Sequence, residues 1–139
     1  MTTSQVFDGL EGVLVARTEL SSVEGDSGRL SVRGRPIESL VSEVPFEAML
    51  ALLLEGTVPE PSRLVALQSE LGQARARAHA HLQSRFEAIA APDAMTTLRS
   101  ALSSLPSDAT PSDALGMAAV ATAGWIRRAR GGQLPAPEP

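Results

Sequence analysis

The stretch from Arg29 to Leu40 constrains the fold most, because it places a strand, a turn and a helix start within twelve residues. Apolar and polar residues alternate from Leu30 to Arg33, which is the period of a half-buried strand. Gly34 permits a positive backbone φ, and Pro36 suits the first position of a helix. The stretch therefore predicts a short strand that leads through a tight turn into a helix.

Aromatic residues are scarce: the 139-residue chain has three Phe, one Trp and no Tyr, although 43% of its residues are hydrophobic. The core must therefore consist of Leu, Val and Ala, which favours closely packed helices over a β-sandwich. We expect a mainly α fold, with multi-helical orthogonal packing and a short N-terminal β-hairpin. Residues 9–132 are expected to form one domain.

The charged and sulfur-containing residues exclude several kinds of chemistry. All twelve basic residues are Arg, so Schiff-base and P-loop lysine chemistry is absent. The net charge of −4 argues against nucleic acid as a partner. The chain has no Cys, and therefore no disulfide, no thiolate nucleophile and no Cys-bound metal.

The N-terminal residues Met1–Gln5 lack the basic segment and the apolar segment of a signal peptide. No apolar run is long enough to span a bilayer. We expect no membrane association and a cytoplasmic location.

The hairpin is expected at about residues 10–33, after a flexible N-terminus at residues 1–8. Val13–Val15 is the expected first strand, and Leu30–Val32 is the expected second strand. The turn residues Gly25–Gly28 lie between them. Because a lone hairpin is only marginally stable in water, we expect it to pack against the helices that follow.

Proline starts, glycine ends and apolar stripes predict the helices. Gly56 is expected to end one helix, and Gly72 to end or bend the next. Thr110 and Asp113 form a capping-box pattern at the start of the last helix. Residues 74–90 alternate Ala with Arg and His, and we expect a helix that is exposed on most sides. The expected helices cover about residues 36–43, 45–55, 61–72, 74–90, 93–105 and 111–130, and a Pro-rich tail follows at 133–139.

A series of stretches in the same order resembles the citrate synthase family. In one of them, Ala91 stands where the family usually has a histidine. The stretches and the family patterns that they resemble are Gly9–Ala16 (G-L-x-G-V), Gly28–Leu40 (G-R-L-x-x-R-G-x-P-I-x-x-L), Phe46–Pro59 (F-E-E-V-x-x-L-L-x-x-G-x-x-P), Pro92–Leu105 (H-P-M-x-x-L-R-x-x-V-S-x-L after its histidine) and Trp125–Pro139 (Y-Y-R-x-R-x-G-x-x-P-x-x-P).

The resemblance implies a citrate-synthase-like segment of the family's large domain, restricted to its N-terminal part. Citrate synthases condense acetyl-CoA with oxaloacetate. The resemblance implies that their catalytic histidines and aspartate, their oxaloacetate-binding arginines and their CoA site lie beyond the end of this chain. No catalytic, cofactor-binding or metal-binding residue is therefore carried over. Acetyl-CoA is expected as a substrate only where a partner chain completes the site.

The two histidines do not offer a substitute active site. His79 and His81 are two residues apart, so on a helix they point to nearly opposite sides. They can form neither one acid–base pair nor the i, i+4 pair that chelates a metal. We expect surface histidines. Together with these histidines, the neighbouring Arg75, Arg77 and Arg85 form either an anion-binding or nucleotide-binding patch or, as the acidic composition favours, a solvated helix face.

The last helix is rich in Gly and Ala, which allow close helix packing. The resemblance implies that helices 93–105 and 112–130 build a subunit interface, and the alternative is core packing within the chain. The interface candidates are Leu98, Leu102, Leu105, Leu115, Val120 and Trp125.

Three functions fit these observations. The first is a citrate-synthase-family subunit, inactive alone, that joins a homo-oligomer or a complementary subunit carrying the catalytic residues. The second is a non-catalytic protein-interaction or regulatory subunit. The third is a truncation product without a separate role.

Overall fold

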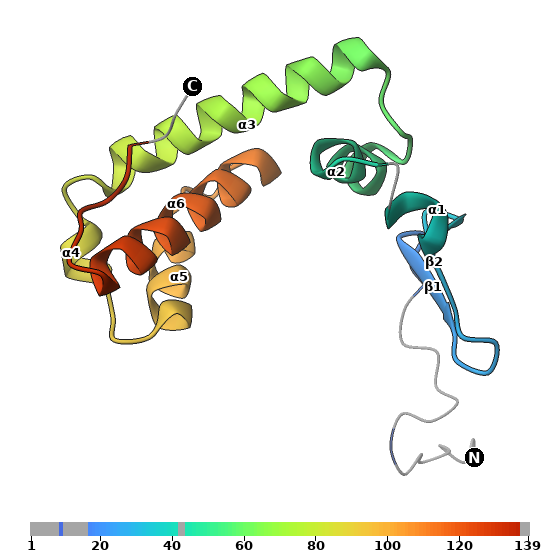
Figure 1. Cartoon of the computed structure of the whole chain (residues 1–139), viewed down its shortest axis with the longest axis horizontal. Helices are drawn as coiled ribbons and strands as arrows, with labels where there is room; N and C mark the ends of the chain where they lie inside the picture. Colours follow the sequence, from blue (N-terminus) through green and yellow to red (C-terminus); the bar gives the residue numbers. More distant parts are fainter. Residues whose placement is uncertain (1–8, 10–16, 42–43, 137–139) are drawn as a thin grey trace, which may run out of the picture. The chain divides into compact units, whose positions relative to one another are not determined.

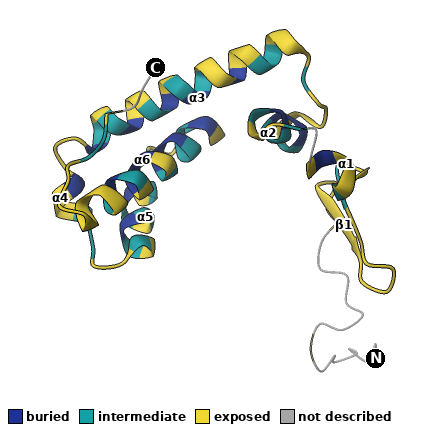
Figure 2. Cartoon of the chain, viewed as in Figure 1, coloured by how far each residue is buried: buried dark blue, intermediate teal, exposed yellow. Residues whose placement is uncertain are grey.

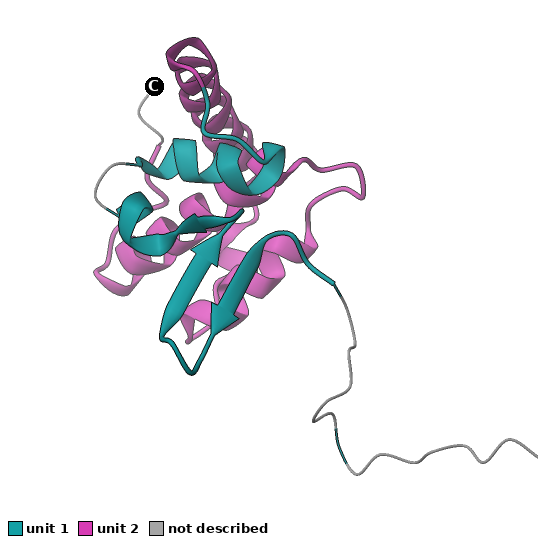
Figure 3. Cartoon of the chain, turned by 90° about the vertical axis from the view of Figure 1, so that its right-hand side faces the viewer, with its two compact units in different colours: residues 1–59 teal, residues 60–139 magenta. Residues whose placement is uncertain are grey.

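The computed structural model describes residue 9 and residues 17–41 and 44–136. The chain divides into two compact units, residues 1–59 and residues 60–139 (Figure 3). The single domain expected for residues 9–132 stays a prediction. The expected flexible N-terminus and the expected strand Val13–Val15 lie outside the described residues. Figure 1 shows the order of the elements along the chain.

The first unit contains a three-stranded antiparallel sheet of order β1-β2-β3. Strand β1 (Ser21–Glu24) pairs with β2 (Arg29–Val32) from Ser21 opposite Val32 to Glu24 opposite Arg29. The short β3 (Arg35–Pro36) pairs with the other side of β2. Strand β2 is therefore the central strand of the sheet.

This pairing corrects the predicted hairpin. Leu30–Val32 is part of strand β2 as expected, and its partners are β1 and β3. The Gly25–Gly28 turn directly joins β1 to β2, and a short loop closes at a smaller entropic cost than a long one. Strand β1 escaped prediction because Val23 is its only apolar residue.

A two-residue turn joins β2 to β3, and both of its residues have positive φ, 49° at Arg33 and 75° at Gly34. This is the backbone of a type I′ turn, which suits Gly but is unusual for Arg. The Arg33 side chain donates from Nη2 to the carbonyl oxygen of Leu53 at 2.8 Å. It thereby joins this turn to the last turn of α2 (Phe46–Glu55).

Helix α1 (Ile37–Val41) starts directly after Pro36, and Leu40 is its buried residue. Helix α2 buries Ala48, Ala51 and Leu52 and ends at Gly56, whose φ is 84° and whose N–H donates to the carbonyl of Leu52 at 3.0 Å. Gly56 thus ends the helix as expected, in the left-handed conformation that glycine adopts without strain.

In the second unit, one continuous helix replaces the two expected at 61–72 and 74–90. Helix α3 runs from Pro61 to Leu82, and the short α4 (Phe86–Ile89) follows. The prediction that Gly72 ends or bends a helix is wrong. One helical glycine destabilises a helix by only about 1 kcal/mol. The burial of apolar residues on both sides of it, Leu71 and Ala74 among them, offsets that cost.

Helix α5 (Ala94–Ser103) and helix α6 (Pro111–Ala129) begin with side-chain caps. The carboxylate of Asp93 accepts from the N–H of Thr96 at 2.8 Å, and this bond lowers the pKa of Asp93 below its usual value. Thr110 and Asp113 form the expected capping box at the start of α6. The spacing of a hydroxyl residue and an acidic residue in the sequence therefore predicted the start of α6 correctly.

The core of the second unit lies between α3, α5 and α6, where Figure 2 shows buried residues on the facing sides of the helices. Four of its seven buried members have small or unbranched side chains, which explains how so few aromatic residues suffice. The buried members are Ala78, Leu82, Phe86, Ala101, Met117, Val120 and Ala121.

Ala74, Ala78 and Leu82 are buried at intervals of four residues, so they form one buried side of α3, whereas Ala76, Arg77 and Ala80 are exposed. The expected extended tail contributes Leu134, which packs against the core. The mainly α fold with a short N-terminal hairpin is confirmed.

Candidate functional site

The site forms where α3 and α6 come closest. A Cβ atom added at Gly116 would lie 2.6 Å from the backbone carbonyl carbon of Ala74, so only glycine fits there. Beside this point, the buried Ser112 donates from Oγ to Oε1 of Glu70 at 2.6 Å. Small residues and one polar bond thus fix the first turns of α6 against the middle of α3.

Asp113 joins the start of α6 to α3 through both carboxylate oxygens. Oδ1 accepts from Arg77 Nε at 2.9 Å and from Arg77 Nη2, and Oδ2 accepts from Thr110 Oγ1 at 2.7 Å and from its N–H at 3.1 Å. The hydrogen bonds from Arg77, followed by those from Thr110, lower the pKa of Asp113 to about 2. The carboxylate is therefore ionised at neutral pH and fully engaged.

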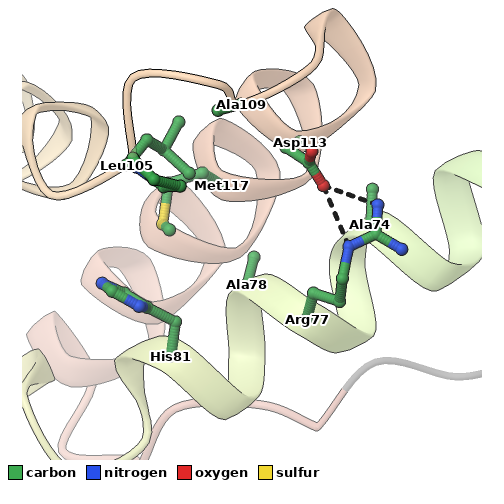
Figure 4. Close-up of a pocket in the computed structure, with 9 residues that line it drawn as sticks. Ala74, Arg77, Ala78, His81, Leu105, Ala109, Asp113 and Met117 are labelled. Carbon is green, nitrogen blue, oxygen red and sulfur yellow. Dashed lines mark hydrogen bonds and ion pairs between the residues drawn. The ribbon is translucent and has the colours of Figure 1, made fainter.

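A pocket of about 210 Å³ opens next to this ion pair (Figure 4). We call it the α3–α6 pocket. Most of its wall is apolar, and the polar groups Arg77, His81 and Asp113 stand at its edge (Figure 4). Its lining residues are Ala74, Arg77, Ala78 and His81 of α3, Leu105, Pro106 and Ala109 of the α5–α6 connection, and Asp113 and Met117 of α6.

His81 is held by two neighbours. Ser104 Oγ donates to the carbonyl of Ala101 at 2.7 Å, so it must accept the bond from His81 Nε2 at 3.0 Å. Arg85 Nη1 lies 3.4 Å from Nδ1 and 3.2 Å from Nε2 of His81. Because His81 lines the pocket, these contacts place the Arg85 guanidinium beside the pocket.

The structure separates the two histidines as the sequence predicts. His81 lies at the pocket, whereas His79 is not among the pocket residues, and both are half-buried. Within the described ranges, no three or more His, Asp or Glu side chains are placed to hold a metal ion. The residues that line the pocket offer one imidazole and one ion pair, and no free carboxylate that could act as a base.

The six interface candidates fall into two groups. Val120 is part of the core, and Leu102, Leu105 and Trp125 pack against it. The indole of Trp125 also donates from Nε1 to the carbonyl of Ala91 at 3.1 Å. Core packing, the alternative reading, accounts for these four. Leu98 and Leu115 are half-buried and lie outside this cluster. An interface role for the six candidates stays a prediction.

Sequence reasoning missed the α3–α6 pocket and the role of Arg77. The predicted capping role of Asp113 is correct. Arg77 was expected on a solvated helix face, but only about half of its side chain is exposed, because it pairs with Asp113. One signal was present: Arg77, His81 and Arg85 follow each other at intervals of four residues, which places them on one side of a helix.

Among the helices of the described part of the chain, none is long and apolar enough to cross a membrane.

The comparisons with known proteins agree on one family. The family model described as "Citrate synthase, C-terminal domain" matches residues 9–138. Citrate synthase of Haloferax volcanii is 43% identical over 67 residues, which are 48% of this chain and 18% of that protein. Citrate/2-methylcitrate synthase of Bacillus subtilis is 28% identical over 120 residues, which are 86% of this chain and 28% of that protein.

A solved structure supports the fold. The crystal structure of citrate synthase from Thermotoga maritima has a TM-score of 0.74 and 23% sequence identity, and the match covers 93% of this chain and 36% of that one. The present chain thus spans between a fifth and about a third of the length of these relatives. The match of the family model over nearly the whole chain shows that the protein belongs to the citrate synthase family.

Proposed function

We propose that this chain is the helical scaffold part of an enzyme that condenses acetyl-CoA with oxaloacetate, and that it is inactive alone. The catalytic groups then come from sequence outside these 139 residues, in a complementary chain. The proposal rests on the difference between two coverages of the structural match. The match covers 93% of this chain but only 36% of the Thermotoga maritima enzyme.

The chemistry of the described residues supports this division. The condensation needs a base that removes a proton from the acetyl methyl group and an acid that polarises a carbonyl. At the α3–α6 pocket, both oxygens of Asp113 accept hydrogen bonds, and His81 already binds Ser104 and Arg85. Neither group is available as such a base without breaking these contacts.

The test is an assay of thiol release from acetyl-CoA in the presence of oxaloacetate. The purified chain alone is expected to give no release above background. Propionyl-CoA serves as a second substrate, because one of the relatives is named a citrate/2-methylcitrate synthase. Release by the chain alone, at a rate that scales with its concentration, would overturn the proposal.

A second experiment co-expresses this chain with a separate polypeptide from the same genome that contains the rest of the fold. Co-expression is expected to give a complex that co-purifies and releases CoA. A complex without activity would support the second candidate, a non-catalytic interaction or regulatory subunit. Cell fractionation of the complex tests the cytoplasmic location that this proposal includes.

We also propose that α5 and α6 contribute to self-association or to the contact with the complementary chain. Met95 is 63% and Ile126 is 41% exposed, and Leu98 and Leu115 are half-buried, so both helices have apolar side chains accessible for such a contact. Light scattering after size exclusion is expected to give a mass above 14.5 kDa. Replacing Met95 and Leu98 by Gln should shift the mass toward the monomer, and replacing Val65 on α3 by Gln should not.

A further inference from the structure

We propose that the α3–α6 pocket binds a small organic anion with an apolar body, of the class of short-chain carboxylates. The apolar chain would occupy the pocket, and the carboxylate would lie over the basic side of α3 at its edge. This binding is separate from the condensation reaction proposed above and needs only the residues of the second unit.

The size and the lining of the pocket set the apolar part of the ligand. A volume of about 210 Å³ is below the roughly 300–1,000 Å³ of pockets for drug-sized ligands, which excludes a nucleotide or a whole coenzyme. Ala74, Ala78 and Met117 are buried and carry no polar side-chain group. Such a wall favours an aliphatic chain and offers nothing to a sugar or a second charged group.

The charge at the pocket edge sets the anionic part. Arg77, His81 and Arg85 are successive residues at intervals of four on α3, so neighbours in the row are about 6 Å apart along the helix. The acidic residue that lines the pocket is Asp113, and its carboxylate accepts its hydrogen bonds from Arg77 and Thr110. One positive charge, that of Arg85, therefore remains uncompensated beside the pocket of a chain whose net charge is −4.

Arg85 is held in place rather than free in solvent. Its Nη1 lies 3.2–3.4 Å from the ring nitrogens of His81, and His81 is fixed by Ser104 on the neighbouring helix end. No carboxylate in the described ranges lies within ion-pair distance of Arg85. A guanidinium that lies against an imidazole ring and lacks a carboxylate partner is suited to bind an anion. His81 is thus a positioning residue for Arg85.

The test is a titration of the isotopically labelled 139-residue chain with hexanoate, followed by amide chemical shifts. Saturable shifts are expected at Ala78, Ala109 and Met117, with a Kd of about 1–10 mM, as befits so small a ligand. Hexanamide has the same apolar chain without the charge, and it is expected to bind about threefold to fivefold more weakly. Equal binding of both compounds would overturn the anionic part of the proposal.

Three variants locate the binding. Arg85→Gln is expected to weaken hexanoate binding about threefold to fivefold and to leave hexanamide unchanged. Ala109→Leu fills the pocket from the α5–α6 connection and is expected to abolish the shifts of both compounds. Arg99→Gln, an exposed change on α5, is the matched control and should alter neither.

Two further outcomes would overturn the proposal. One is the absence of saturable shifts at the pocket residues up to about 100 mM hexanoate, ten times the weakest Kd expected. The other is unchanged hexanoate binding in Arg85→Gln, a variant of an exposed side chain that should fold normally even if Ala109→Leu does not. Circular dichroism of each variant checks the fold independently of binding.

Discussion

Arg77 and Asp113, 36 residues apart in sequence, join the middle of α3 to the first turn of α6 through a bond of 2.9 Å from Nε to Oδ1. The same Asp113 caps α6 together with Thr110. One carboxylate therefore serves a helix end and a helix–helix contact at once, and its ionisation affects both.

Asp113 should make stability depend on pH in the acid range. Its folded pKa of about 2 is below the ordinary value of 3.8, so its stabilising effect is fully present above about pH 4 and is lost as pH falls through 2. Asp113→Asn is expected to lower the melting temperature at pH 7 and to have little effect near pH 2. Melting curves between pH 7 and 2 measure the difference.

Asp108→Asn, a change in the exposed α5–α6 connection, is the matched control for the loss of one acidic residue. A constant difference between Asp113→Asn and the unchanged chain at all pH values would contradict the assigned role of Asp113.

Gly116→Ala should destabilise the second unit. The new methyl group would lie 2.6–2.9 Å from backbone atoms of Ala74 and Arg75, which cannot turn aside as a side chain can. Overpacking of this kind typically destabilises by about 1–3 kcal/mol. Urea unfolding followed by circular dichroism at 222 nm measures the change. A stability equal to that of the unchanged chain would mean that the two helices do not come this close.

Gly72→Ala should stabilise the chain, although Gly72 too lies inside a helix. The nearest atom that an added Cβ would meet there is Arg75 Nη2, at 3.9 Å, so the methyl group fits. Alanine favours the helical backbone over glycine by about 0.5–1 kcal/mol. The same urea experiment serves both glycines, and a loss of stability in Gly72→Ala would argue against a continuous α3.

Arg33→Ala should loosen the end of α2 in the first unit. It removes the bond from the guanidinium to the Leu53 carbonyl, a charge-assisted bond of a kind that contributes about 1.5–3 kcal/mol. Arg33 is also only 21% exposed, and its Nε is buried without a partner, so its position is determined by packing rather than by solvent. Faster hydrogen exchange of the Gly56 amide, which bonds to Leu52, is the expected result.

Arg35→Ala changes the exposed arginine of β3 and should leave that exchange rate unchanged. Equal rates in both variants and in the unchanged chain would show that the Arg33 side chain does not hold the helix end.

The sequence predicted the helices best where local chemistry defines their ends. Thr110 and Asp113, three residues apart, indicate the start of α6, and Gly56 after an apolar stripe indicates the end of α2. Each of these signals lies within one helical turn of the helix end that it indicates. Gly72 misled the prediction because its small helical penalty is local, whereas the burial that offsets it comes from α6, a helix about 40 residues away in sequence.

The candidate site could not be predicted in the same way. The row Arg77, His81 and Arg85 is visible in the sequence, but nothing local says that Asp113 neutralises the first of them or that Ser104 orients the second. The pocket itself depends on how two helices and a connecting loop pack, and no periodicity of one segment encodes that arrangement. For the same reason, the sequence could not distinguish residues of a subunit interface from residues of the core, since a stripe of Leu residues is typical of both.

The contact of Gly116 with the backbone of Ala74 restricts how the second unit can move. Two helices whose backbones already touch can rotate about the touching point, but they cannot approach further there. Two wall residues of the α3–α6 pocket lie just past this contact. Ala78 is one turn after Ala74 on α3, and Met117 is one residue after Gly116 on α6. A change in the distance between the α3 wall and the α6 wall of the pocket is therefore a change of crossing angle, whereas the wall of Leu105, Pro106 and Ala109 belongs to the α5–α6 connection.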